Sequence, residues 1–249
     1  LEQKVLMIIQ DLYTDKPNVW VEQYALVLNN LSFSYVWNNE TDKALSLVKE
    51  ALSITKNHYN KNPRVWGLLY TSNLNNLASL YKNINQIDDA IELEKEALSI
   101  VKDFYHKNTS VYAEQYVLNL NNLGSSYKYK KQIEKSIVLL KKSLQITREL
   151  YPKNPNVWAK LHSINLNNLG SSYKDSNQIS KAIELSQEAL LITKDFYKKN
   201  PRVWVELYMS NLNNLASSYA KNKQIEESRS LRTEVLSITK NLYNENKKV

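Results

Sequence analysis

The tetrapeptide Leu-Asn-Asn-Leu occurs five times at one fixed interval, and this repetition constrains the fold more than any other feature of the 249-residue sequence. The copies begin at Leu28, Leu74, Leu120, Leu166 and Leu212, so the period is 46 residues. Self-similarity at periods of about 20–50 residues is typical of solenoids, in which each unit mainly contacts its neighbours. The length of the chain therefore measures a number of repeats rather than a number of globular cores.

Each repeat has the pattern of two helices. The chain holds only three Gly and five Pro, so it contains few residues that break helices. The apolar residues of one copy keep helical spacing, at Tyr112, Tyr116, Leu120, Leu123 and Tyr127. We predict two helices of about 20 residues per repeat, joined by a short polar turn into an αα-hairpin. Stacked hairpins make an all-α solenoid.

The predicted helix ends follow from the same pattern. Asn62-Pro63, Asn154-Pro155 and Asn200-Pro201 each place an N-cap residue before a proline at the first helical position. The first helix of a repeat should end near Tyr127 or its equivalents, and the second should begin near Gln132-Ile133. The predicted division is a truncated repeat at 1–16, whole repeats at 17–62, 63–108, 109–154, 155–200 and 201–246, and the start of another at 247–249.

Both ends stop within the pattern. We therefore expect the chain to be part of a larger protein in which the remaining sequence carries an effector domain. Ends without polar capping helices also predict that isolated chains stack end to end.

Several residues carry a resemblance to a known family. Leu123-Gly124, Tyr127 and Gln132-Ile133, with the alanine pair Ala44 and Ala51 of another copy, resemble the tetratricopeptide repeat. The Leu-Asn-Asn-Leu-Ala/Gly motif resembles the repeat of kinesin light chains. The period of 46 residues is longer than the 34 residues of the family. The resemblance implies a right-handed superhelix that binds a protein or peptide segment in a concave groove lined by the first helices.

The sequence offers no constellation for catalysis. It has no His-Glu-x-x-His, no glycine-rich phosphate loop and no Gly-x-Ser-x-Gly. We interpret its three histidines, His58, His106 and His162, as structural, because no partner cluster accompanies them. We expect no enzyme activity, no metal and no cofactor. The lack of Cys fits a cytoplasmic location, and no apolar run is long enough to predict a membrane span.

The net charge of +8 raises the question of nucleic-acid binding. Many of the basic residues fall in the last turn of a predicted helix, where they complement the helix dipole. We therefore rank nucleic-acid binding below protein binding. A spacer or self-association array without a peptide ligand is the other alternative.

The asparagine pairs are the sharpest functional signal. Asparagine is a weak helix former, and its amide both donates and accepts hydrogen bonds, which suits an extended peptide backbone. By resemblance, the predicted peptide ligands are a first column, Asn29, Asn75, Asn121, Asn167 and Asn213, and a second column, Asn30, Asn76, Asn122, Asn168 and Asn214. The other interpretation is that these amides bond between adjacent first helices, or persist from recent duplication. The sequence leaves both open.

Further residues share the predicted groove. Ser125 and Ser171, with their equivalents Ser79 and Ser217, lie on the same helix face as the asparagines. Lys82, Lys128 and Lys174 lie near its edge, and they predict an acidic or phosphorylated partner. Phe33 and Trp37 interrupt the polar pattern of the first repeat. Together they would make an apolar pocket, whereas for either residue alone we favour core filling.

Overall fold

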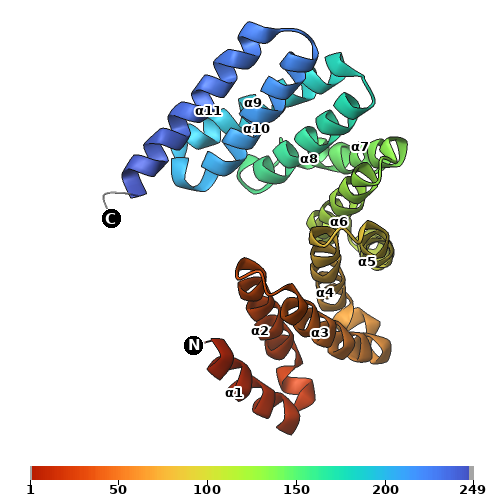
Figure 1. The fold of residues 1–249 in the computed structure, drawn as a ribbon. Helices are drawn as coiled ribbons and strands as arrows, with labels where there is room; N and C mark the ends of the chain where they lie inside the picture. Colours follow the sequence, from red (N-terminus) through yellow and green to blue (C-terminus); the bar gives the residue numbers. More distant parts are fainter. Residues whose placement is uncertain (1, 247–249) are drawn as a thin grey trace. The chain divides into compact units, whose positions relative to one another are not determined.

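The computed structural model describes residues 2–246, and this range is built from helices without a strand. The helices of this range are α1 (Glu2–Asp15), α2 (Pro17–Trp37), α3 (Thr41–Lys61), α4 (Pro63–Asn83), α5 (Ile87–Lys107), α6 (Thr109–Tyr129), α7 (Ile133–Leu150), α8 (Pro155–Asp175), α9 (Ile179–Lys199), α10 (Pro201–Lys221) and α11 (Ile225–Asn246). Consecutive helices run back and forth as hairpins (Figure 1). The all-α solenoid prediction is confirmed.

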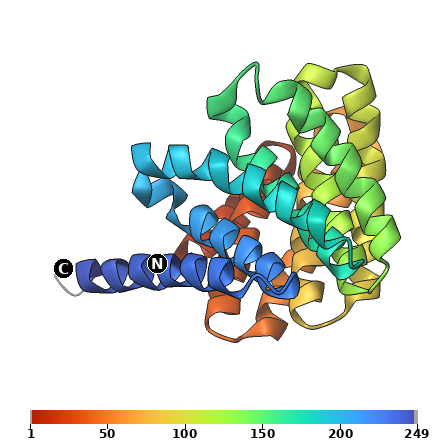
Figure 2. The ribbon, with the colours of Figure 1, turned by 90° about the horizontal axis from the view of Figure 1, so that it is seen from above.

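The chain divides into two compact units, Leu1–Ser126 and Tyr127–Val249. In unit 1, α4 packs against α3 and α5; in unit 2, α8 packs against α7 and α9. Successive first helices also touch, as α2 does with α4 and α8 with α10. Within each unit, the first helices therefore form one row and the second helices another. In both views α11 lies alongside α10 (Figures 1 and 2).

The helix starts follow the prolines more closely than the predicted caps. The Asn62 side chain accepts a bond from the Val65 amide at 3.4 Å. Asn154 and Asn200 occupy the predicted N-cap positions, but their side chains make no capping hydrogen bond. A proline at the first helical position has its φ angle preset and no N–H to satisfy, and this is sufficient to start both helices.

The hairpin turns share one backbone feature. A residue with φ near +60° follows each first helix, and these residues are Asn39, Asn85, Lys131, Asn177 and Lys223. The first helices end two residues later than predicted, for example at Tyr129 rather than Tyr127. The second helix α7 begins at the predicted Ile133, and α5, α9 and α11 begin at the equivalent isoleucines, whereas α3 begins at Thr41.

Aromatic stacking connects each second helix to the next first helix. In unit 1, Tyr59 stacks on Tyr70 with ring centroids 4.9 Å apart. In unit 2, Tyr197 stacks on Tyr208 at 4.6 Å. Alanines such as Ala189, which is fully buried, let the helices approach closely. These contacts fix the register between repeats. No helix within the described residues is both long and apolar enough to cross a membrane.

Candidate functional site: the first-helix face

The first-helix face is the side of the first helices that carries the second-column asparagines, the serine column and, near its edge, the three lysines. Asn30 and Ser79 are exposed, whereas Asn122 and Ser125 of α6 are half-buried. The remaining half-buried members are Asn76, Asn168, Asn214, Ser171, Ser217, Lys82, Lys128 and Lys174. The face therefore presents amides and hydroxyls to solvent at a repeated spacing.

Three of the first-column asparagines bond to the neighbouring first helix. Asn29 donates from its amide nitrogen to the Asn73 amide oxygen at 2.6 Å, and Asn75 donates to Asn119 at 3.0 Å. Asn167 donates in the same way to Asn211. These are the inter-helix bonds of the second interpretation. Asn29, Asn121 and Asn167 are buried and Asn75 is half-buried, whereas Asn213 on α10 is exposed. Contact of this column with a peptide stays a prediction.

A third asparagine column was missed by the sequence reasoning. Its members are Asn73, Asn119, Asn165 and Asn211, all buried. Asn73, Asn119 and Asn211 accept the first-column bonds. Three members also donate to a threonine of the preceding second helix: Asn73 to Thr55 (3.3 Å), Asn165 to Thr147 (3.1 Å) and Asn211 to Thr193 (2.8 Å). The signal was available, because both asparagine and threonine recur at the 46-residue period.

The second column lies at the edge of this network. The Asn122 amide nitrogen donates to Asn75 at 3.5 Å, so the second column of one helix reaches back to the first column of the previous helix. Asn30 has no previous first helix beside it and is exposed. On α2, α6 and α8 the second-column asparagine is therefore closer to solvent than the first-column asparagine, whereas on α10 the first-column Asn213 is the exposed one.

The three predicted lysines divide into two kinds. Lys82 forms an ion pair at 2.9 Å with Glu94, which is almost fully buried on α5. Lys128 donates to the Ser171 hydroxyl at 2.8 Å, and Lys174 donates to the Ser217 hydroxyl at 2.9 Å. The charge of Lys82 is neutralised within the fold, whereas the other two ammonium groups have hydroxyl partners.

Burial affects the ionisation of both lysines in unit 2. Loss of solvent lowers the pKa of Lys128, while the nearby Asp175 acts in the opposite direction. Burial likewise lowers the pKa of Lys174; Asp175 opposes this effect, and the charges of Lys128 and Lys221 add to it. Their protonated forms are thus less well solvated than those of surface lysines.

The aromatic residues of the first repeat lie on the surface. Trp37 is 87% exposed and Phe33 is 46% exposed. The core-filling interpretation is therefore wrong for both. They share the exposed side of α2 with Leu26, at positions where the other first helices carry mostly smaller or polar residues.

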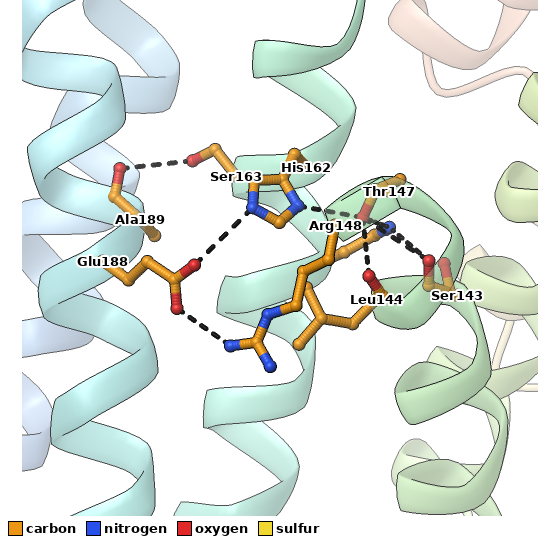
Figure 3. Close-up of polar contacts among 9 residues, drawn as sticks. Ser143, Leu144, Thr147, Arg148, His162, Ser163, Glu188 and Ala189 are labelled. Carbon is orange, nitrogen blue, oxygen red and sulfur yellow. Dashed lines mark hydrogen bonds and ion pairs between the residues drawn. The ribbon is translucent and has the colours of Figure 1, made fainter. Parts of the chain in front are cut away.

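One cluster of titratable groups lies inside unit 2 (Figure 3). His162 approaches the Thr147 hydroxyl through Nδ1 at 2.9 Å, and its Nε2 lies 3.6 Å from Glu188. Arg148 donates to the same carboxylate at 3.0 Å. The bond from His162 lowers the pKa of Glu188; burial acts against this shift, and the charge of Arg148 adds to it.

The same place in other repeats is taken by a tyrosine–glutamate bond. Tyr70 donates to Glu96 at 2.7 Å, and Tyr208 donates to Glu234 at 2.5 Å. Thr147 and His162 are buried, so a substrate has no access to them. His162 fills the tyrosine column, as predicted, and holds α7, α8 and α9 together. Within residues 2–246 we find no group of three or more His, Asp or Glu placed to hold a metal ion.

A groove between the second helices α7 and α9 was not predicted. It has a volume of about 570 Å³, and its floor is formed by Leu169 and Tyr173 of α8. Lys141 and Lys181 place their ammonium groups 5.9 and 5.2 Å from the centre of the Tyr173 ring. Both charges are thus held by the ring at the groove rim.

Comparison with known proteins supports the assignment of the repeat. Residues 25–64, 74–102, 120–156 and 165–196 match the tetratricopeptide repeat. No curated protein matches the chain.

Solved structures share the fold at low sequence identity. BtubC (BKLC) from P. vanneervenii has a TM-score of 0.75 at 19% identity, covering 97% of this chain and 89% of that one. A putative kinesin light chain with nearly identical TPR-like repeats from Podosopora anserina has a TM-score of 0.60 at 19% identity, with coverages of 85% and 93%. The apo form of RapI gives 0.67 at 15% identity, with coverages of 90% and 73%.

The period, the paired helices and the residues matched to the repeat agree with one another. The chain belongs to the tetratricopeptide repeat family and has a fold of the kinesin-light-chain type.

Proposed function

We propose that the chain is a non-catalytic protein-binding scaffold that holds an acidic partner segment on the first-helix face of unit 2. The observation that carries this proposal is the state of Lys128 and Lys174. Each is half-buried and bonded to a serine hydroxyl, and no carboxylate of the described residues lies within ion-pair distance of either ammonium. Asp175 is close enough to affect both lysines but forms an ion pair with neither, and a partly desolvated ammonium that lacks an ion-pair partner gains from contact with an anionic group.

The neighbouring polar groups suit an extended segment. Asn168 precedes Ser171 by three residues on α8, and Asn214 precedes Ser217 by three on α10, so each pair lies on one helix face. The amides would bond the backbone of the partner, and its carboxylates would reach the lysines. Asn30 and Asn76 offer the same amide chemistry in unit 1. There Glu94 already neutralises Lys82, and for this reason we place the acidic site in unit 2.

The test uses a labelled peptide of six Glu-Gly units, a matched peptide of six Gln-Gly units and a single-stranded RNA. We expect the chain to bind the Glu peptide, and Lys128→Met/Lys174→Met to weaken that binding by at least about tenfold. The control Lys198→Met/Lys240→Met removes the same charge from two exposed lysines and should leave the affinity within about threefold.

Two results would contradict the proposal. Equal losses in the two double variants would mean that only net charge matters. RNA binding that is tighter than peptide binding and falls steeply with salt would favour a nucleic-acid partner instead.

A further inference from the structure

Two buried asparagines of the third column are each held by two residues of the preceding repeat. Asn73 accepts a bond from Asn29 and donates one to Thr55. Asn211 is held by Asn167 and Thr193 in the same way. A first-column asparagine and a second-helix threonine thus form a receptor for one amide on the next first helix.

The first interface of the chain follows a different rule. Ile9 of α1 stands at the threonine position, and Val27 of α2 stands at the third-column position. The two side chains belong to one apolar cluster. A polar receptor therefore faces Asn73 and Asn211, and an apolar residue faces Val27. Asn119 has Val101 at the threonine position and donates instead to the Gln115 carbonyl of its own helix, at 2.8 Å.

The same receptor is present on α10 and α11, where both of its members are exposed. Asn213 follows Asn167 by one period, and Thr239 follows Thr193 by one period. The Thr239 hydroxyl donates to the Val235 carbonyl at 2.9 Å, as Thr193 does to Ala189 at 3.0 Å, so its acceptor side is directed as in the filled receptor. Nearby Leu236 is 69% exposed, whereas its equivalent Leu190 packs in a core cluster.

We propose that the α10–α11 face binds a helix with the pattern of this chain's own first helices, Tyr-x-x-Asn. Its asparagine would accept from Asn213 and donate to Thr239, and its apolar side would cover Leu236. The argument rests on continuity, because the face repeats the α8–α9 surface on which α10 itself packs. Tyr208-x-x-Asn211 of α10 is the matching ligand motif at that surface.

A second copy of the chain is a poorer occupant. Its α2 carries Tyr24-x-x-Val27, so stacking α2 on this face would place a valine against Asn213 and Thr239. Both polar groups would then lose water without gaining a partner. The face therefore discriminates by one residue of the incoming helix.

The first experiment measures binding of a labelled peptide with the sequence of Pro201–Lys221 to the full chain. The control peptide carries Asn211→Val. We expect the Asn peptide to bind at least about tenfold more tightly. Asn213→Ala and Thr239→Val should each remove most of this preference, and circular dichroism should show both variants to be folded, because both side chains are exposed.

A free peptide must fold into a helix when it binds, and this requirement weakens its affinity. A second experiment avoids the problem by attaching the helix to the chain. The sequence of residues 204–221 is fused after Val249, with either Asn or Val at the position of Asn211. The Asn fusion should melt several degrees higher and should protect α11 amides from hydrogen exchange.

Three results would overturn the proposal. These are equal melting of the two fusions, peptide binding that ignores Asn213→Ala, and self-association of the unmodified chain that Asn213→Ala abolishes. The last result would identify a second copy as the occupant.

Discussion

Asn167 of α8 donates a side-chain hydrogen bond to Asn211 of α10, and Asn211 in turn donates to Thr193 of α9. One buried amide thus joins three helices of unit 2. The Asn211 amide nitrogen also lies within hydrogen-bond distance of the Ser163 hydroxyl, at 2.9 Å, and of the Ala189 carbonyl, at 3.0 Å, and its two hydrogens are shared among these acceptors.

Removing the centre of this network should cost stability. We expect Asn211→Ala to lower the free energy of unfolding by about 2–3 kcal/mol, because buried polar groups lose their partner. Urea denaturation followed by circular dichroism measures the effect. Asn213→Ala is the matched control, since its side chain is exposed, and it should change stability by less than about 0.5 kcal/mol. Similar losses in the two variants would contradict the role given to Asn211.

A second prediction concerns how the buried ion pair between Lys82 and Glu94 affects the free energy of unfolding. Lys82→Met leaves a buried carboxylate without a counter-charge, so we expect a loss of about 3 kcal/mol. Lys82→Met/Glu94→Leu should return to within about 1 kcal/mol of the unmodified chain, because apolar replacement of a whole buried pair is often neutral. Leucine is the residue that the next repeat carries at this position, as Leu140. A double variant as unstable as the single one would refute this account.

The environment of His58 predicts a pH dependence. Burial, with a smaller contribution from the charge of Lys61, lowers the pKa of His58 from its ordinary value near 6.5. Below that value the unfolded chain binds a proton that the folded chain does not, so stability should fall as the pH drops from 7.5 towards 5.5. His58→Phe, which copies Phe104 of the next repeat, should lose less stability over this range. Thermal melts of both proteins at the two pH values measure the difference.

Glycine substitutions in the hairpin turns are predicted to stabilise the fold. Lys131 and Lys223 have φ near +62°, a region that costs energy for residues with a β-carbon. Lys131→Gly and Lys223→Gly should each raise the free energy of unfolding by about 0.5–1 kcal/mol. Asn177→Gly at the equivalent turn should gain less, because asparagine tolerates this region. Denaturant midpoints of the three variants provide the test, and equal gains would argue against a backbone cause.

The period and the apolar spacing were enough to predict the helices, because both depend on local sequence. The start of α7 at Ile133 was predicted correctly, and the end of α6 was missed by two residues. The direction of the asparagines was harder to predict. An amide on a helix suits a peptide or a neighbouring helix equally well, and only the distance between α8 and α10 decides for Asn167.

Two other residues show what local patterns leave out. The large apolar side chain of Trp37 favoured a place in the core, yet in the structure α2 directs it to solvent. Glu94 is an acid at a position where the two adjacent repeats carry Val48 and Leu140, and its pairing with Lys82 across the hairpin depends on how α4 packs on α5. An acid at such a position is a signal that the sequence contained and the interpretation left unused.

The contrast between Ile9 with Val27 and Thr193 with Asn211 has a consequence for protein engineering. Repeats of equal length could in principle be reordered, but the residues at the interfaces between these repeats are not interchangeable. A chimaera that moves residues 17–62 behind Thr193 would bring Val27 to a hydroxyl that Asn211 pairs in this chain. Single side chains at the interfaces between repeats therefore restrict the order in which the repeats can be joined.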